Sequence, residues 1–188
     1  QFIRRARGYT PCPIKLPRAG PSVLATGAWL KNTVCITRGD EAFLSPHVGD
    51  LDNAATCNAL VEMVEHLCTV LDVRPQAVAH DLHPDFFSTR FALEFANSRS
   101  LPTHAVQHHH AHVAAIAAEH GIDGPLLGLA LDGIGLGSDD KGLIAAGYAL
   151  QEPKLTVRER VYILQKLDRQ DEALLLALEA RVVHLHAE

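Results

Sequence analysis

Four histidines fall within five positions of one short segment: His108, His109, His110 and His112. The alanine-rich residues that follow them are typical of a helix. Because residues four positions apart share one face of a helix, His108 and His112 can direct two imidazoles to one point. Two neutral imidazoles form half of a site for zinc, iron or a similar cation, with carboxylates supplied from elsewhere. We therefore interpret His108 and His112 as metal ligands; the alternative is a helix N-terminus with solvated histidines.

A second group of reactive side chains lies where a predicted strand, Ala77–His80, gives way to a helix. His80, Asp81 and His83 stand together at this junction. Side chains at a strand end beside a cleft can bind substrate by hydrogen bonds or transfer protons, so these three are candidate catalytic residues. Asp85 is expected to cap the following helix, and that structural role could be all it does.

A third segment combines an acid with glycines directly after an apolar run. Asp132, Gly133, Gly135 and Gly137 follow the predicted strand Leu126–Leu131. Glycine lets backbone N–H groups approach a phosphate closely, and the neighbouring acid suits a metal ion that bridges phosphate oxygens. The spacing matches neither the P-loop nor the dinucleotide fingerprint, and a glycine-rich hairpin turn is the alternative. We expect a nucleotide- or phosphate-binding role, to which Lys31 could add a cation unless it only forms a β-turn.

Covalent catalysis through an acyl-enzyme is disfavoured. Ser88 and Ser138 lack the Gly-x-Ser-x-Gly elbow, and none of the four cysteines lies in an electropositive setting. The cysteines form no Cys-x-x-Cys pair, so we expect free thiols and a cytoplasmic protein.

The composition narrows the class of protein. A chain of 188 residues with 47% apolar residues suits one globular domain, or one domain with a small appendage. The formal net charge of −5 gives no reason to expect nucleic acid as a partner. No apolar run reaches the roughly 18 residues that a membrane span requires.

The order of apolar patterns predicts the fold class. Proline-rich residues 1–22 are expected to be an irregular linker. Strands are predicted at 23–25, 33–37 and 42–45, with a turn at Gly39-Asp40 before the third. A helix capped by Asp52 follows, and then strand 77–80, helix 85–97, strand 103–106, helix 108–120 and strand 126–131. Strands joined by tight turns and then alternating with helices indicate an α/β fold, a mixed sheet with flanking helices.

This fold would bring the three segments together. Functional groups in such sheets gather where the strands end, and each segment begins at the end of a predicted strand. The last residues, 156–167 and 171–186, are expected to form a helical hairpin whose leucines cover another surface.

Taken in order, several segments resemble the HypF carbamoyltransferase family, which helps to make the cyanide ligands of [NiFe]-hydrogenases. The segments are RRARGY at 4–9, GAWLKNT at 27–33, ITRGD at 36–40, AHDLHPD at 79–85, the histidine cluster and LDG at 131–133. The resemblance covers about residues 1 to 138. It implies the first lobe of an ASKHA, RNase H-like fold within a domain related to the TsaD tRNA threonylcarbamoyl-transferase.

The resemblance also implies a chemistry. In that family, carbamoyl phosphate and ATP give carbamoyl-adenylate, and the carbamoyl group passes to the C-terminal cysteine of a HypE partner. The family's His-x-x-x-His metal pair falls on His108 and His112.

The resemblance has limits that shape the domain assignment. We expect residues 1–22 to follow a YrdC-like domain, 23–150 to be a partial TsaD-like domain, and 151–188 to be a helical tail of another origin. The adenylating domain and the second ASKHA lobe are not encoded in this sequence, so we expect a fragment of a carbamoyltransferase. The alternative is a metal-binding or protein-interaction module without turnover.

Overall fold

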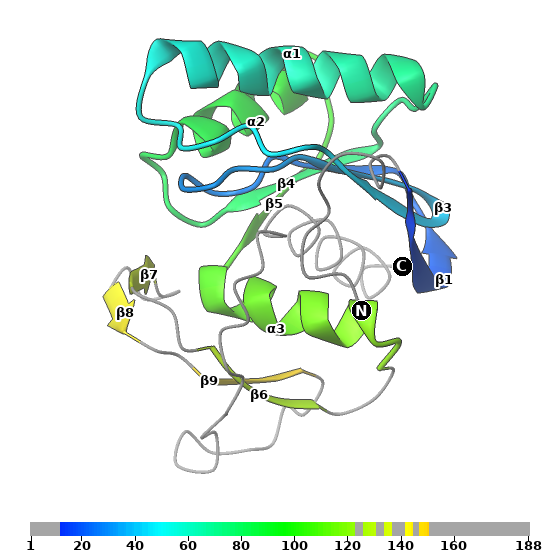
Figure 1. Ribbon diagram of the computed structural model, residues 1–188, viewed down its shortest axis with the longest axis vertical. Coiled ribbons are helices and arrows are strands. Elements are labelled where there is room, and N and C mark those ends of the chain that lie inside the picture. Colours follow the sequence, from blue (N-terminus) through cyan, green and yellow to red (C-terminus); the bar gives the residue numbers. More distant parts are fainter. Residues whose placement is uncertain (1–11, 123–125, 131–133, 137–141, 145–146, 151–188) are drawn as a thin grey trace.

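The computed structural model describes residues 12–122, 126–130, 134–136, 142–144 and 147–150. Its centre is a five-stranded sheet in the order β1-β3-β2-β4-β5 (Figure 1). The strands are β1 (Ile14–Gly20), β2 (Val23–Ala25), β3 (Cys35–Leu44), β4 (Ala77–Asp81) and β5 (Thr103–Val106). The pairs β1–β3 and β3–β2 are antiparallel, whereas β2, β4 and β5 run parallel. The predicted mixed sheet is therefore confirmed.

The three parallel strands end at one edge of the sheet. Ala25 pairs with Ala79, and Asp81 pairs with Val106, so the chain leaves β2, β4 and β5 on the same side. We call the residues gathered there, 26–33, 80–85 and 107–112, the carboxyl edge.

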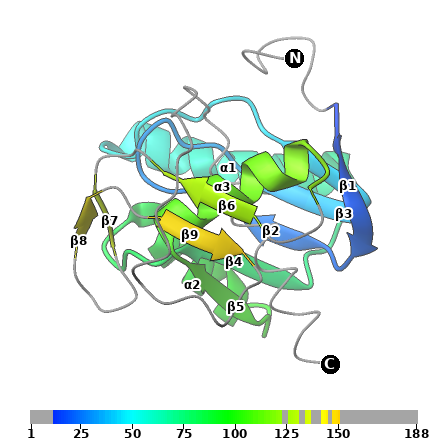
Figure 2. The same cartoon turned by 90° about the horizontal axis from the view of Figure 1, so that it is seen from below.

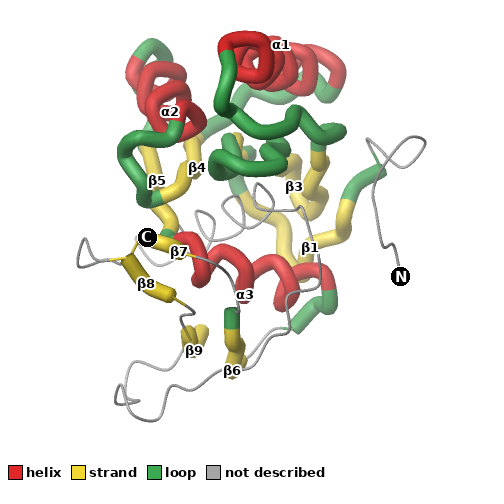
Figure 3. The backbone as a smooth tube through the Cα atoms, turned by 60° about the vertical axis from the view of Figure 1, so that its left-hand side comes forward, coloured by secondary structure: helices red, strands yellow, loops and turns green. Residues whose placement is uncertain are grey.

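Helices cover both faces of the sheet. Helices α1 (Ala54–Val70) and α2 (Phe87–Asn97) lie on one face, and α3 (His108–Glu119) lies on the other (Figures 1 and 3). Each face has its own core. The core under α1 and α2 includes Leu24, Ile36, Leu60, Val64, Val78 and Phe95, and the core under α3 includes Val23, Ala25, Ala79, Val106, Ala111, Ala115 and Ala118.

Helix α3 lies between two sheets. Strand β6 (Leu126–Leu129) pairs antiparallel with β9 (Gly147–Leu150), and this ribbon lies on the side of α3 away from the five-stranded sheet (Figures 1 and 2). A second small ribbon joins β7 (Ile134–Leu136) to β8 (Gly142–Ile144). Because α3 is covered on both sides, residues around most of its circumference are buried: His109, Ala111, Val113, Ala114, Ala115, Ala117 and Ala118.

Two predictions about the strands were wrong. Residues 14–20 of the predicted linker form β1, an edge strand, where Pro17 is tolerated because one side of the strand needs no hydrogen-bond donors. The predicted turn at Gly39-Asp40 is absent, since β3 continues through it. Gly39 takes a φ of 58° and accommodates an irregular register against β1, so it bends the strand without ending it.

Two predicted helix caps were also wrong. The side chain of Asn53, not Asp52, caps α1 by accepting the Thr56 N–H at 3.1 Å. Helix α2 begins at Phe87, two residues after Asp85, and has no side-chain cap. In both cases the predicted acid lies two positions before the first helical residue, a shift that sequence patterns do not resolve.

Other predictions lie at the limit of the described residues. The strand predicted at 126–131 is described over Leu126–Leu129 and pairs with β9. The predicted tail at 151–188 and residues 1–11 lie outside the described residues. Among the helices of the described part, none is long and apolar enough to cross a membrane.

Candidate functional site at the carboxyl edge

Asp81 is the residue through which β4 meets α3. Its side chain is only 3% exposed, and its Oδ2 lies 2.9 Å from Nδ1 of His108. Its Oδ1 accepts the backbone N–H of His83 at 2.7 Å. The predicted convergence of the second segment with the histidine cluster is therefore confirmed at atomic contact.

The backbone of Asp81 is held as firmly as its side chain. Its carbonyl oxygen accepts hydrogen bonds from the Thr89 hydroxyl at 3.2 Å and from Nδ1 of His80 at 2.8 Å. The next residue, Leu82, donates its N–H to the Val106 carbonyl and extends the β4–β5 ladder. The carboxylate thus projects from a fixed point of the sheet edge.

The four clustered histidines have different surroundings. The rings of His108 and His112 lie 4.9 Å apart between centroids and meet edge to face. His109 is fully buried inside the molecule. The backbone N–H of His110 donates a hydrogen bond to the Gln107 side chain at the start of α3. The His108 ring also meets that of His109, at 5.8 Å between centroids, so the pair selected by helical spacing, His108 and His112, makes the closer of these two ring contacts.

Gln107, which the sequence analysis did not single out, sets the start of α3. Its Oε1 accepts the His110 N–H at 2.8 Å, as an N-cap side chain does. Its Nε2 donates to the Leu136 carbonyl of β7 at 3.0 Å. One side chain thus joins the histidine helix to the glycine-rich segment. A polar residue immediately before a predicted helix was the available signal for it.

The loop after β2 is built around Asn32. Its buried Nδ2 donates to the carbonyls of Thr26 and Ala28, each at 2.8 Å. Gly27 has a φ of 69°, and a Cβ there would lie 2.5 Å from the Thr33 carbonyl oxygen, so no larger residue fits.

Lys31 lies on this loop at the carboxyl edge. It is exposed, has a φ of 48°, and its backbone N–H donates to Oδ1 of Asp50 at 2.6 Å. The Ser88 hydroxyl, at the start of α2, donates to the Ala28 carbonyl and ties the loop to the β4–α2 junction. The predicted phosphate-binding role of Lys31 stays a prediction.

The three candidate catalytic residues lie in different environments. His80 is 6% exposed and is bonded back to the main chain, whereas the carboxylate of Asp81 is directed toward α3. The ring of His83 stacks on Phe86 at 4.3 Å between centroids and 5° between planes, and its Nδ1 accepts the Asp85 N–H. Their catalytic roles stay predictions, but the three side chains do not meet at one point.

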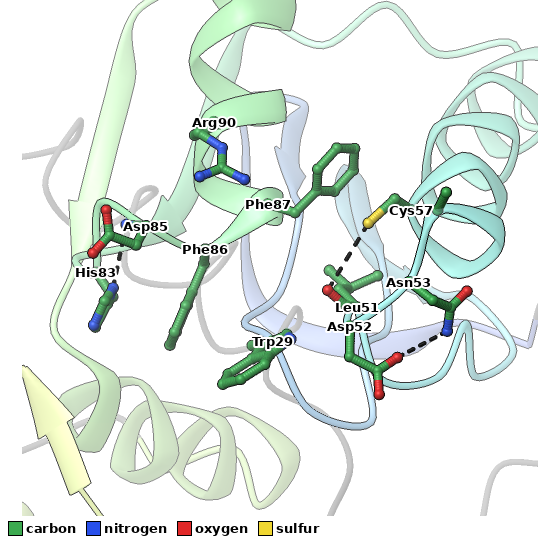
Figure 4. Close-up of a pocket in the computed structure, with 11 residues that line it drawn as sticks. Trp29, Leu51, Asp52, Asn53, Cys57, His83, Asp85, Phe86, Phe87 and Arg90 are labelled. Carbon is green, nitrogen blue, oxygen red and sulfur yellow. Dashed lines mark hydrogen bonds between the residues drawn. The ribbon is translucent and has the colours of Figure 1, made fainter.

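His83 belongs to a pocket between the loop after β2, α1 and α2 (Figure 4). The pocket has a volume of about 560 Å³, and Trp29, Phe86 and His83 line one side of it. Trp29 is 43% exposed, and its ring lies 6.0 Å from that of Phe86. The other lining residues are Leu51, Asp52, Asn53, Ala54, Cys57, Asp85, Phe87 and Arg90.

The donor set partly fits a divalent cation. His108 and His112 supply two imidazoles, and because Nδ1 of His108 contacts Asp81, a metal would be bound through Nε2 of that ring. Within the part of the chain that the structure describes, no group of three or more His, Cys, Asp or Glu side chains could hold a metal ion.

The glycine-rich segment is described only in part. Gly135 lies in β7 and pairs with Leu143 of β8. Asp132, Gly133 and Gly137 lie outside the described residues, so their predicted phosphate-binding role stays a prediction.

Comparison with known proteins identifies the family. Residues 18–119, more than half of the chain, match the HypF Kae1-like domain. Carbamoyltransferase HypF2 of Cupriavidus necator is 71% identical over 139 residues, which are 74% of this chain and 17% of that protein. Carbamoyltransferase HypF of Rhizobium leguminosarum bv. viciae is 57% identical over 138 residues, which are 73% of this chain and 18% of that protein.

Solved structures agree with this assignment. A crystal structure of full-length HypF in the phosphate- and nucleotide-bound form superposes with a TM-score of 0.73 at 44% identity, over 79% of this chain and 19% of that chain. The crystal structure of T. kodakarensis HypF gives a TM-score of 0.74 at 33% identity, over 79% of this chain and 20% of that chain. The chain spans less than a fifth of the length of the two carbamoyltransferases named above. By sequence and by fold, the chain belongs to the HypF family, whose Kae1-like domain it matches.

Proposed function

We propose that this chain supplies the first lobe of a HypF-type carbamoyltransferase domain. In this role it takes part in passing a carbamoyl group from carbamoyl-adenylate to the C-terminal cysteine of a HypE-type partner. The observation that carries the proposal is the match of residues 18–119 to the HypF Kae1-like domain. The contact between Asp81 and His108 supports it, because the matched region contains a built polar site as well as a core.

His108 and His112 are the proposed ligands of a divalent metal, zinc or iron. The metal would bind and polarise oxygens of a phosphate or carbamoyl group when present. The chain's own contribution is to hold two imidazoles on one turn of a buried helix, with Asp81 in contact with His108.

Lys31 and the glycine-rich segment at 132–137 are the proposed contacts to ATP or carbamoyl-adenylate. Lys31 lies at the carboxyl edge with its side chain exposed, where a cation can meet a phosphate. The bond from Gln107 to the Leu136 carbonyl, within that stretch of sequence, joins β7 to the start of the histidine helix and supports this role.

A domain replacement tests the proposal. Residues 18–119 of this chain replace the matching residues of Cupriavidus necator HypF2. The chimera is then assayed with ATP, carbamoyl phosphate and a HypE-type protein. We expect carbamoylation of the partner's C-terminal cysteine, detected by intact-protein mass spectrometry. The double change His108→Ala and His112→Ala in the chimera should abolish it, whereas His66→Ala, an exposed histidine on α1, should not.

A folded chimera that does not carbamoylate would contradict the proposal. Metal content then separates the remaining possibilities. If the inactive chimera still binds metal through His108 and His112, the non-catalytic metal-binding module is the better description of this segment.

A further inference from the structure

The carboxylate of Asp81 lies where it can determine which ring nitrogen of His108 carries the proton. An ionised carboxylate only accepts hydrogen bonds, so the 2.9 Å contact requires a proton on Nδ1 of the imidazole. In the neutral ring the other nitrogen, Nε2, then carries the lone pair. That nitrogen lies on the side of the ring away from the carboxylate, where it can bind a metal.

The geometry leaves Asp81 little freedom for another task. Both side-chain oxygens already accept a hydrogen bond, one from the His83 N–H and one from His108, and the side chain is 3% exposed. A general acid or base needs an oxygen that reaches the substrate proton. The contacts of Asp81 therefore point toward His108 and not toward a bound substrate.

The supports of Asp81 make its position rigid. The Thr89 hydroxyl and the His80 ring bind its carbonyl oxygen from two different elements. A carboxylate fixed at its backbone and at one oxygen can hold the ring bonded to its second oxygen in one orientation. Carboxylate–histidine pairs of this kind determine both the ring orientation and the basicity of metal-binding histidines.

From these contacts we propose that Asp81 is a positioning residue for the metal pair, and that it holds His108 as the Nδ1–H tautomer with Nε2 directed to the ion. The inference rests on the proposed metal role of His108 and His112. It assigns to Asp81 a role through His108, in place of direct contact with the reacting groups.

The first test needs no variant. Long-range proton–nitrogen correlation spectra of the metal-free, isotope-labelled 188-residue chain distinguish the two tautomers of each histidine, and the signal absent from His108→Gln identifies His108. We expect the Nδ1–H tautomer. An Nε2–H tautomer for His108 in the unsubstituted chain would overturn the proposal.

The second test uses Asp81→Asn, which has a single side-chain carbonyl to meet two donors. Its amide NH₂ can face His108 only if Nδ1 loses its proton, which moves the proton to Nε2 and blocks the metal-binding nitrogen. We expect a shift to the Nε2–H tautomer and about 10–100-fold weaker Co²⁺ binding, measured by visible absorption and calorimetry. Asp85→Asn, the same change at an exposed position in the same segment, should bind Co²⁺ as the unsubstituted chain does.

The outcomes separate this proposal from the proposed metal pair. If His108→Ala and His112→Ala leave Co²⁺ binding unchanged, the metal pair is wrong, whatever the tautomer. If those changes abolish binding but a folded Asp81→Asn chain keeps full affinity and the original tautomer, the positioning role is wrong and the metal pair stands. Circular dichroism establishes that each variant is folded.

Discussion

The two faces of the central sheet are built differently. On one face, α1 packs a single stripe of Leu60, Val64 and Leu67 against the sheet and leaves its opposite side exposed. On the other face, most of the circumference of α3 is buried, and its buried residues are mainly alanines together with His109. A one-sided helix is an ordinary surface helix, whereas a helix covered on both sides is an internal element. The histidines of the candidate site are carried by the internal helix.

Because of this difference, one face of the sheet contributes mainly to stability, whereas the other carries the candidate metal ligands. Large aliphatic side chains under α1 contribute apolar burial, and that face of the sheet carries none of the candidate metal ligands. Alanines on α3 allow the helix to lie close to the sheet that carries Asp81, since a methyl side chain separates the backbones least. We expect substitutions on the two faces to have different consequences.

The largest effect is expected from Leu60→Ala. Leu60 is fully buried under α1, so the change leaves a cavity and should lower the free energy of unfolding by about 2–5 kcal/mol. Val70→Ala, at a 57% exposed position of the same helix, should change it by less than about 0.5 kcal/mol. Urea denaturation measures both. If Leu60→Ala also weakened Co²⁺ binding in the folded chain, the two faces would not be independent.

A smaller loss of stability is expected from Ala115→Leu, which adds volume where α3 meets the sheet. Overpacking should cost about 1–3 kcal/mol, and the displaced helix should also bind Co²⁺ less tightly. Ala55→Leu, the same change at an exposed position of α1, should leave both quantities nearly unchanged. Thermal melts and metal titrations of the two variants give the comparison. Equal metal affinity in both would show that close packing of α3 is not needed for the pair.

The α1 cap provides a test of the corrected helix boundary. Asn53→Ala removes the side chain that accepts the Thr56 N–H and should lower the free energy of unfolding by about 1 kcal/mol. Asp52→Ala should have a smaller effect, because the Asp52 carboxylate bonds only to the Asn53 side chain in the described contacts. Should the Asp52 variant prove the less stable of the two in urea, the cap assignment would be wrong.

The smallest effect concerns the thiols on the α1 side. Burial raises the pKa of the Cys68 thiol above its ordinary value of 9.0, because the thiolate is removed from water. The unfolded chain then loses this proton at lower pH than the folded chain, so stability should decline slightly as the pH rises above about 9. In Cys68→Ala this decline should be reduced.

Iodoacetamide should also label Cys68 more slowly than the exposed Cys12, as peptide mapping can measure. Equal labelling rates would indicate that α1 opens readily.

Local patterns in the sequence predicted much of this molecule. Short strands such as 77–80 and 103–106, and the helix that begins at the histidines and ends at Gly121, follow from apolar periodicity and chain breakers. The pairing of His108 with His112 follows from helical spacing alone. The resemblance to the HypF family rests on motifs that are visible without a structure.

Other features depend on contacts between residues far apart in the chain. Nothing near Pro17 in the sequence indicates that an edge of the sheet is free to accept residues 14–20, and nothing near Gly39 distinguishes a bent strand from a turn. The cap at Asn53 depends on where the backbone turns after Leu51.

The same distinction holds for the candidate site. The sequence placed His80, Asp81 and His83 at a strand end, because a strand-to-helix junction is a local feature. Only the tertiary structure decided that the carboxylate of Asp81 faces His108 while the ring of His83 turns to the pocket beside Phe86. The physical reason is that a hydrogen bond across 27 positions of chain exists only once β4 and β5 pair in parallel and bring their carboxyl ends together.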